Sequence, residues 1–206
     1  MLTPANLDPA SAVSGDGSLF TFPHECTGEN RAMFVCICYI PDANQQVQSV
    51  TYNGVPLTKF PDVTQIRADV YEEFWYMVAP TAGVADVSVQ LSASAKTTVG
   101  ACSVNGVAQS GLIYFKAGGV GDMVSEIPIA CQAQNGDMLI GFGACAGNAG
   151  TSVESWQTSV WDVVQAGNIR SQCIASFPNF TAPITVANHI DPPCRWAVDI
   201  LGVGSA

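Results

Sequence analysis

The stretch that decides the fold is YEEFWYMVAPTAGVADVSVQLSASAKTTVGACSVN, residues 71–105. Over 73–78, Phe74, Tyr76 and Val78 alternate with Glu73, Trp75 and Met77. After an Ala-Pro-Thr-Ala-Gly turn, apolar and polar residues alternate over 86–91. A third run of this kind covers 97–104, after Ser-Ala-Ser-Ala-Lys. A period of two on both sides of a turn rich in Pro and Gly is typical of antiparallel strands with one face on a core. We therefore predict three strands here.

Similar short runs recur along the rest of the chain, with turn signals about every 8–12 residues, as in an all-β sandwich. Residues 32–40, AMFVCICYI, are almost continuously apolar and predict a strand covered on both faces. Asn53-Gly54 predicts a type I′ hairpin turn, because both central residues of that turn need a positive φ. The sequence thus predicts an antiparallel, jelly-roll-like β-sandwich of roughly ten to eleven strands over residues 18–206. Residues 1–17 are expected to form an extended arm.

Three further segments have sequence signals of their own. Residues 117–122 predict a glycine-rich loop, and Asn135-Gly136 predicts a second hairpin turn. Residues 177–193 contain four prolines and predict a long excursion that covers a sheet edge or makes contacts. We expect the final strand of the sheet to follow directly, over 195–203.

The charge balance excludes several classes of partner. The 206 residues include 7 Lys and Arg against 17 Asp and Glu, a formal net charge of -10, and only 12% are charged. Nucleic acids and anionic membrane surfaces are disfavoured as partners, because both require clustered basic residues. No window approaches the ~18 apolar residues of a membrane span, and the N-terminus lacks the pattern of a signal peptide. We expect synthesis in a cytoplasm and a weakly charged surface that packs against neighbours at little desolvation cost.

The cysteines are expected to be mostly small buried side chains that stay reduced, because they are spread along the chain and several lie in apolar runs. The alternative is one or two disulfides, with Cys173 and Cys194 as the first pair because they flank proline-rich sequence. Zinc is not expected, since there is no Cys-x-x-Cys pair and neither His24 nor His189 has ligand-like spacing to the thiols. The eight cysteines are Cys26, Cys36, Cys38, Cys102, Cys131, Cys145, Cys173 and Cys194.

No catalytic constellation stands out. Only His24 and His189 are available as general bases, and neither lies in a motif such as Gly-x-Ser-x-Gly. Glu72 and Glu73 are adjacent on a predicted strand, so they should face opposite sides and cannot form an acid/base pair. We predict no catalytic residues and no enzymatic activity.

A structural calcium ion is the one cofactor that we consider. Asp16, Glu25 and Asp199 would lie near the seam where the first and last strands of a jelly roll meet. No Asp-x-Asp-x-Asp-Gly loop is present, so ordinary surface carboxylates are the alternative, and we expect no resident metal.

Aromatic residues are candidates for contacts with a ligand or a partner. Trp75 and Tyr76 should face opposite sides of one strand, so one of them would reach an outer face. A sugar platform needs exposed rings, whereas a Trp in a sandwich is more often part of the core. The candidates for a ligand or interface role are Trp75, Trp156 and Trp161.

Three segments carry a resemblance to a known family. They are SLFTFPHECTGENRAMFVCICYI, VQSVTYNGVPLTKF and EEFWYMVAPTAGVADVSVQLSASAKTTVGACSVNGVAQ, within residues 18–109. This half of the chain resembles a β-sandwich module found in many bacterial secreted proteins and phage-encoded proteins, and Trp196–Val203 would be its last strand. The resemblance implies a fold and an accessory or display role, without catalytic residues.

In phages, similar jelly-roll domains are capsid decoration (cement) proteins and parts of tails and fibres. The resemblance thus implies a virion protein on the outer capsid surface, made in the host cytoplasm, with the major capsid protein as its partner. We expect a homo-oligomer, with a trimer favoured. The alternative is a carbohydrate- or receptor-binding module of a tail, a fibre or a secreted protein.

Overall fold

The computed structural model describes residues 1–41, 44–61, 64–67, 70–146, 150–152, 157–165, 169–178 and 182–206. Over these residues the protein is an all-β, antiparallel sandwich, as predicted. Its only helix among them is a single 3₁₀ turn, η1 (Pro4–Asn6). No helix in the described part of the chain is long and apolar enough to cross a membrane.

The first sheet has eight strands from the N-terminal half of the chain. They are β1 (Ser11–Cys26), β2 (Ala32–Ile40), β3 (Val47–Tyr52), β4 (Val55–Pro56), β5 (Thr58–Lys59), β6 (Thr64–Arg67), β7 (Val70–Val78) and β8 (Gly83–Val104). The second sheet has six strands, which are β9 (Ile113–Ala133), β10 (Met138–Ala146), β11 (Gly150–Ser152), β12 (Gln157–Gln165), β13 (Ile169–Ser176) and β14 (Ala182–Val203). The predicted count was lower, in part because the return strand expected after Asn53-Gly54 is divided into β4 and β5 and because β6 and β11 are short.

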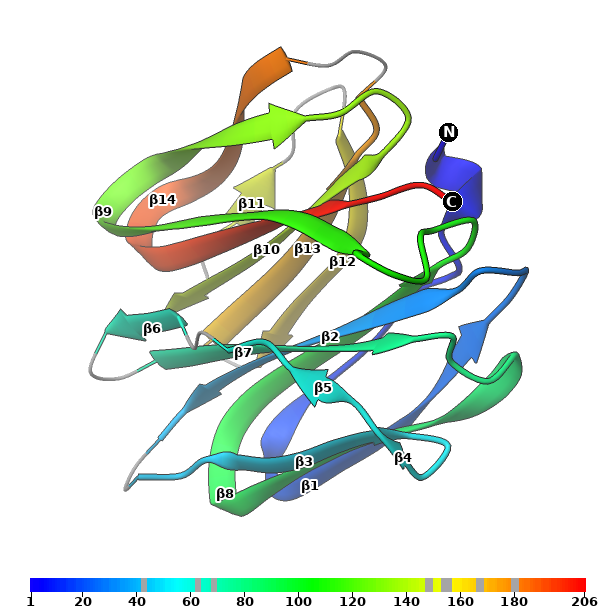
Figure 1. The fold of residues 1–206 in the computed structure, drawn as a ribbon. Helices are drawn as coiled ribbons and strands as arrows, with labels where there is room; N and C mark the ends of the chain where they lie inside the picture. Colours follow the sequence, from blue (N-terminus) through cyan, green and yellow to red (C-terminus); the bar gives the residue numbers. More distant parts are fainter. Residues whose placement is uncertain are drawn as a thin grey trace.

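The first sheet bends so that it forms two layers. The first half of β8 pairs with β3 and with the second half of β1, whereas its second half pairs with β2 and with the first half of β1. The bend falls at small residues, Ser92–Ala95 in β8 and a register shift between Gly17 and Leu19 in β1. Figure 1 shows three layers as a result, with β3 and the β1–β8 bend outermost, β2 and β7 in the middle, and the second sheet beyond them.

Each face of the middle layer packs on its own core. Along β2, Phe34, Cys36 and Cys38 contribute to the core between the two sheets, which we call the first core. Their neighbours Val35 and Ile37 contribute to the second core, which lies inside the bent first sheet. This confirms the prediction that residues 32–40 form a strand covered on both faces.

The segment 71–105 forms β7 and β8, but not as a simple strand pair. Strand β2 lies between them in the sheet and is antiparallel to both. The runs 86–91 and 97–104, predicted as separate strands, are one continuous strand, because Ser-Ala-Ser-Ala bends without ending the ladder. The hairpin at Asn53-Gly54 is confirmed, since both residues have a positive φ and Tyr52 pairs with Val55 across the turn.

The prediction of an extended arm over residues 1–17 is wrong. Leu2 is buried in the first core, and its N–H donates to the carbonyl of Gly136 at 2.6 Å. Residues 11–17 belong to β1 and pair with β8. The polar and small residues of this segment suggested an arm, but backbone pairing to β8 does not require apolar side chains.

Two predicted loops are also strand in the structure. Residues 117–122 lie inside β9, and most of 177–193 lies inside β14, which pairs with β9 over almost its whole length. Pro192 and Pro193 coincide with a shift in register between His189 and Cys194. The Asn135-Gly136 turn is present, with a positive φ at Gly136, but β9 and β10 do not pair and so form no hairpin.

Candidate functional site

The strongest candidate for a working surface is the outward side of the outer layer. Strand alternation points Phe20, Phe22 and Val89 into the second core, so the residues between them point to solvent. We call this surface the outer face, and it consists of Leu19, Thr21, Pro23, Glu25, Ser49, Thr51, Val84, Asp86, Ser88 and Gln90. Cross-strand register places them in rows, for example Leu19 beside Gln90 and Gln90 beside Ser49.

The outer face combines exposed aliphatic side chains with little charge. Leu19 is 59% exposed and Val84 is 67% exposed, and Val55, at the edge of the same layer, is also exposed. The only ionisable residues of the outer face are the carboxylates of Glu25 and Asp86, and it has no basic residue. The hydroxyl groups of Thr21 and Ser88 hydrogen-bond to each other across the two strands, with 3.4 Å between their oxygens. Such a surface loses few hydrogen bonds to water when another protein covers it.

The predicted ligand aromatics are not brought together on a surface. Trp161 is only 6% exposed and packs in the first core against Phe142, with 5.7 Å between ring centroids, so the prediction of a ligand role is wrong for this residue. Trp75 is half-buried and packs against the second core. Trp156 lies outside the residues that the structure describes.

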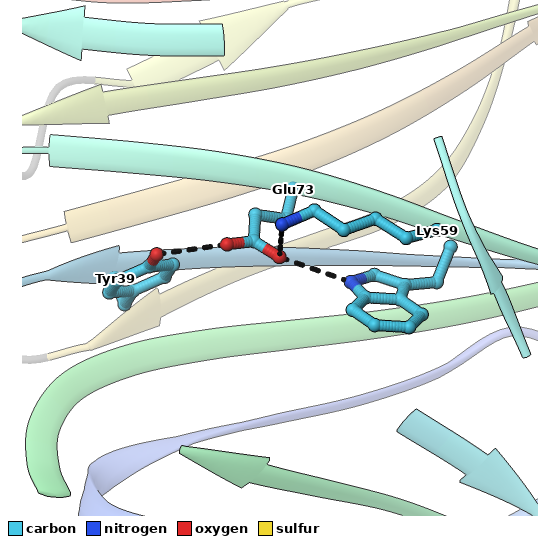
Figure 2. Close-up of polar contacts among 4 residues, drawn as sticks. Tyr39, Lys59 and Glu73 are labelled. Atoms are coloured by element: carbon cyan, nitrogen blue, oxygen red, sulfur yellow. Dashed lines mark hydrogen bonds and ion pairs between the residues drawn. The ribbon is translucent and has the colours of Figure 1, made fainter. Parts of the chain in front are cut away.

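Trp75 takes part in a network around the carboxylate of Glu73 (Figure 2). The Tyr39 hydroxyl donates to Oε1 at 3.0 Å, and Lys59 Nζ lies 2.9 Å from Oε2. The indole N–H of Trp75 donates to Oε2 at 3.3 Å, and Lys59 Nζ lies 5.8 Å from its ring centroid. Burial and the neighbouring Glu73 raise the pKa of Tyr39, so its hydroxyl stays protonated as a donor. The network stabilises a buried charge and leaves no unoccupied carboxylate oxygen for a substrate.

Glu72 faces the opposite way, as the sequence predicted, and meets two thiols in the first core. Its Oε1 lies 3.5 Å from Sγ of Cys36 and 3.9 Å from Sγ of Cys38, and the two sulfurs are 3.7 Å apart. All three residues are fully buried. Burial raises the pKa of Cys36 well above its usual value, so its thiol is protonated and donates to the carboxylate. Among the described residues this is the one group with donor atoms close enough to share a metal ion.

A third polar network joins the N-terminal segment to β1 and β8. Ser103 Oγ donates to Asp8 at 2.7 Å and lies 3.1 Å from Nε2 of His24, whose Nδ1 lies 3.2 Å from Ser11 Oγ. Because the Ser103 proton goes to Asp8, Nε2 carries the imidazole proton and Nδ1 accepts from Ser11. Burial lowers the pKa of His24 to about 4, despite the opposing effect of Asp8. A buried imidazole with this pKa is a weak base, so the network is better suited to stabilising the fold than to activating a nucleophile.

The predicted disulfide is not present. Cys173 is a reduced, buried thiol that interacts with Cys102 across the first core. Strand β10 lies between β13, which carries Cys173, and β14, which carries Cys194, and the side chain of Cys194 is outside the described residues. The other prediction for the cysteines is confirmed for the seven that are described, because all are reduced and buried.

The carboxylates considered for calcium come from strands of both sheets. Asp16 and Glu25 lie nine positions apart on β1, on either side of its bend between Gly17 and Leu19. Asp199 belongs to β14 of the other sheet, and its side chain is outside the described residues. Among the described residues, Asp16 and Glu25 belong to no group of three or more close metal-ligand atoms, so a calcium site there stays a prediction.

No family model, curated protein or solved structure matches this chain. Sequence analysis missed the outer face, although the alternation Leu-Phe-Thr-Phe-Pro over residues 19–23 was a signal for it. It also missed the group formed by Cys36, Cys38 and Glu72, which we call the thiol–carboxylate group. The signal for it was the Cys-x-Cys pattern within a single apolar strand.

Proposed function

We propose that this protein is a structural component of a phage particle, a decoration (cement) protein that binds the outside of the capsid shell and stabilises it. The observation that carries the proposal is the outer face, an exposed sheet surface with two prominent aliphatic residues, Leu19 and Val84, and no basic side chain. A ligand that binds only the assembled shell stabilises that state by mass action.

The composition of the outer face fits a protein partner better than a charged one. Two carboxylates, Glu25 and Asp86, lie on it and repel nucleic acid and anionic lipid. The side chains with hydroxyl or amide groups on the outer face are either short or hydrogen-bonded to neighbours. For example, Nε2 of Gln90 donates to the Ser18 carbonyl at 2.9 Å. Few side chains therefore lose conformational freedom when the surface is covered.

The interior supports the same proposal, because its polar groups stabilise the scaffold. Glu73 is ion-paired and hydrogen-bonded, and His24 is neutral and buried between two serines. Neither lies on a surface that a dissolved substrate would reach. We further propose that the partner is the major capsid protein and that the protein binds as a homo-oligomer, with a trimer favoured.

A glycan-binding module is the less supported alternative. Sugar stacking requires exposed rings, whereas Trp161 is buried and the indole N–H of Trp75 is hydrogen-bonded to Glu73. A screen of immobilised glycans distinguishes the two functions, since binding that is lost in Trp75→Ala but kept in Leu19→Lys would favour the alternative.

The direct test is co-sedimentation of the purified protein with shells that lack it. We expect saturable binding by the wild type and at least about a tenfold weaker affinity for Leu19→Lys, because a buried ammonium without a partner costs more than ~1.4 kcal/mol. Ser110→Lys adds the same charge at an exposed loop residue between β8 and β9 and is the matched control. Absence of wild-type binding, or equal loss in both variants, would contradict the proposal.

Copy number in purified particles tests the location separately. Quantitative mass spectrometry should give a number comparable with that of the major capsid protein. A number typical of a tail component would contradict a role on the shell, even if the protein were part of the particle.

A further inference from the structure

The thiol–carboxylate group of the first core has a chemistry that the proposed function does not use. Cys36 and Cys38 are two residues apart on β2, so both thiols lie on one face of the strand. Glu72 lies on the neighbouring strand β7, directly opposite Cys38 in the register. Two thiols and a carboxylate are thus fixed on a rigid strand pair and are fully buried.

The donor atoms already lie at separations that fit a zinc ion. With Zn–S near 2.3 Å and Zn–O near 2.0 Å, tetrahedral geometry places two sulfur ligands about 3.8 Å apart and a sulfur and an oxygen about 3.5 Å apart. The sulfurs of Cys36 and Cys38 are 3.7 Å apart, and Oε1 of Glu72 is 3.5 Å and 3.9 Å from them. Little movement is needed for all three to share one ion.

The chemistry of the donors selects the ion. Thiolates favour soft or borderline cations, whereas Ca²⁺ and Mg²⁺ take oxygen ligands, so a divalent ion of the zinc class fits this set. Each coordinating thiol releases its proton to water and forms one Zn–S bond in place of its S–H bond. The ion also offsets the cost of keeping the carboxylate of Glu72 in an apolar core.

A candidate fourth ligand lies on the opposite sheet, and its sulfur would have to move closer, because it is not within 4.8 Å of all three donor atoms. Cys173 of β13 is fully buried in the same core, and its thiol interacts electrostatically with Cys36. A closed four-ligand site is the form that structural zinc takes in proteins. Coordination by Cys173 would connect the middle layer to the second sheet.

We propose that Cys36, Cys38 and Glu72, with Cys173 as the fourth ligand, bind one structural Zn²⁺ ion between the two sheets. The proposal is independent of the function on the capsid. Because the site is sealed, the ion enters during folding, and loading is tested by refolding the full chain with Zn²⁺.

The experiment measures bound metal after refolding with Zn²⁺ and desalting, by inductively coupled plasma mass spectrometry. We expect about one zinc per wild-type chain and a loss of at least about 90% in Cys36→Ser/Cys38→Ser, which lacks two of four ligands. Cys131→Ser removes a buried thiol of β9, outside the group, and should keep its zinc. A metal-free wild type, or equal loss in Cys131→Ser, overturns the proposal.

A spectroscopic measurement on the wild type avoids reliance on variants that fold poorly. Refolding with Co²⁺ should give the intense d–d bands of a tetrahedral site and a thiolate-to-cobalt charge-transfer band. Glu72→Gln and Cys173→Ser should each change the d–d bands, whereas Glu73→Gln, whose side chain faces the other core, should not. A wild-type spectrum without a charge-transfer band overturns the site, and an unchanged spectrum in Cys173→Ser overturns its role as the fourth ligand.

Discussion

The interior of this protein and its outer face are built from different chemistry. In the interior, ionisable side chains such as Glu73 and His24 are held by several partners and buried from water. On the outer face, short neutral side chains and exposed aliphatic ones such as Leu19 and Val84 predominate. The ionisable residue types that most often carry chemistry are therefore placed where they stabilise the fold, and the surface that we propose for binding has few of them. Changes in the interior should alter stability, and changes on the outer face should alter binding alone.

The largest expected effect on stability comes from Gly100, which lies on β8 beneath Trp161. A Cβ at this position would lie 2.1 Å from Cε2 of Trp161, in the first core. Gly100→Ala should therefore lower the free energy of unfolding by about 3 kcal/mol or more, because the surrounding core leaves the indole little room to move. Gly15→Ala is the matched control, since its Cβ would meet only an ordinary contact at 3.5 Å. Urea denaturation of both variants checks this, and similar losses would contradict close packing at Trp161.

The second effect concerns pH and arises at His24. Its pKa is about 4 in the folded protein, below the value of 6.5 in an unfolded chain. The unfolded state therefore binds more protons between these values, so stability is complete above about pH 6.5 and is lost as the pH falls, by up to about 3 kcal/mol near pH 4. Measurement of the unfolding free energy from pH 7 to pH 5 checks the prediction. His24→Gln should show a shallower slope, and an equal slope would contradict it.

A smaller effect is expected at Glu73. Glu73→Ala removes the acceptor of the buried Tyr39 hydroxyl and should cost about 1–3 kcal/mol. Lys59 adds little to this loss, because its side chain is 37% exposed and water can solvate it. Glu73→Gln keeps an acceptor oxygen and should lose less. Thermal unfolding of the two variants distinguishes them, and equal losses would show that the network does not depend on hydrogen bonding.

The smallest effect on stability should come from the outer face itself. Leu19→Lys changes an exposed residue that the second core does not contain, so the unfolding free energy should stay within about 0.5 kcal/mol of the wild type. Chemical denaturation checks this directly. A larger loss would mean that the weaker shell binding expected of this variant reflects damage to the fold, and the contrast between interior and outer face would fail.

Local patterns in the sequence predicted the fold class and several of its elements. The apolar run 32–40 predicted a strand buried on both faces, and Asn53-Gly54 predicted a tight turn, because both depend on residues adjacent in the chain. The three-layer arrangement was not predicted. It depends on the bends of β1 and β8, which small residues permit but do not require.

Interpretation of the candidate sites was less successful, for physical reasons that differ between residues. Trp161 was considered as a ligand aromatic, but its environment is set by Gly100, which is distant in sequence and leaves space for the indole. The pairing of Cys173 with Cys194 was predicted from flanking prolines, but three of these four prolines lie within the continuous strand β14. The opposite orientation of Glu72 and Glu73 was predicted correctly, since strand alternation alone determines it.

The most direct test of the capsid proposal is to compare the rupture temperature of particles with and without this protein. Rupture is detected through the release of nucleic acid. We expect shells reconstituted with the wild type or with Ser110→Lys to rupture at a higher temperature than bare shells. Shells mixed with Leu19→Lys, at a concentration that just saturates the shells with the wild type, should rupture at a temperature closer to that of bare shells. Identical rupture temperatures for bare shells and shells saturated with the wild type would contradict the account.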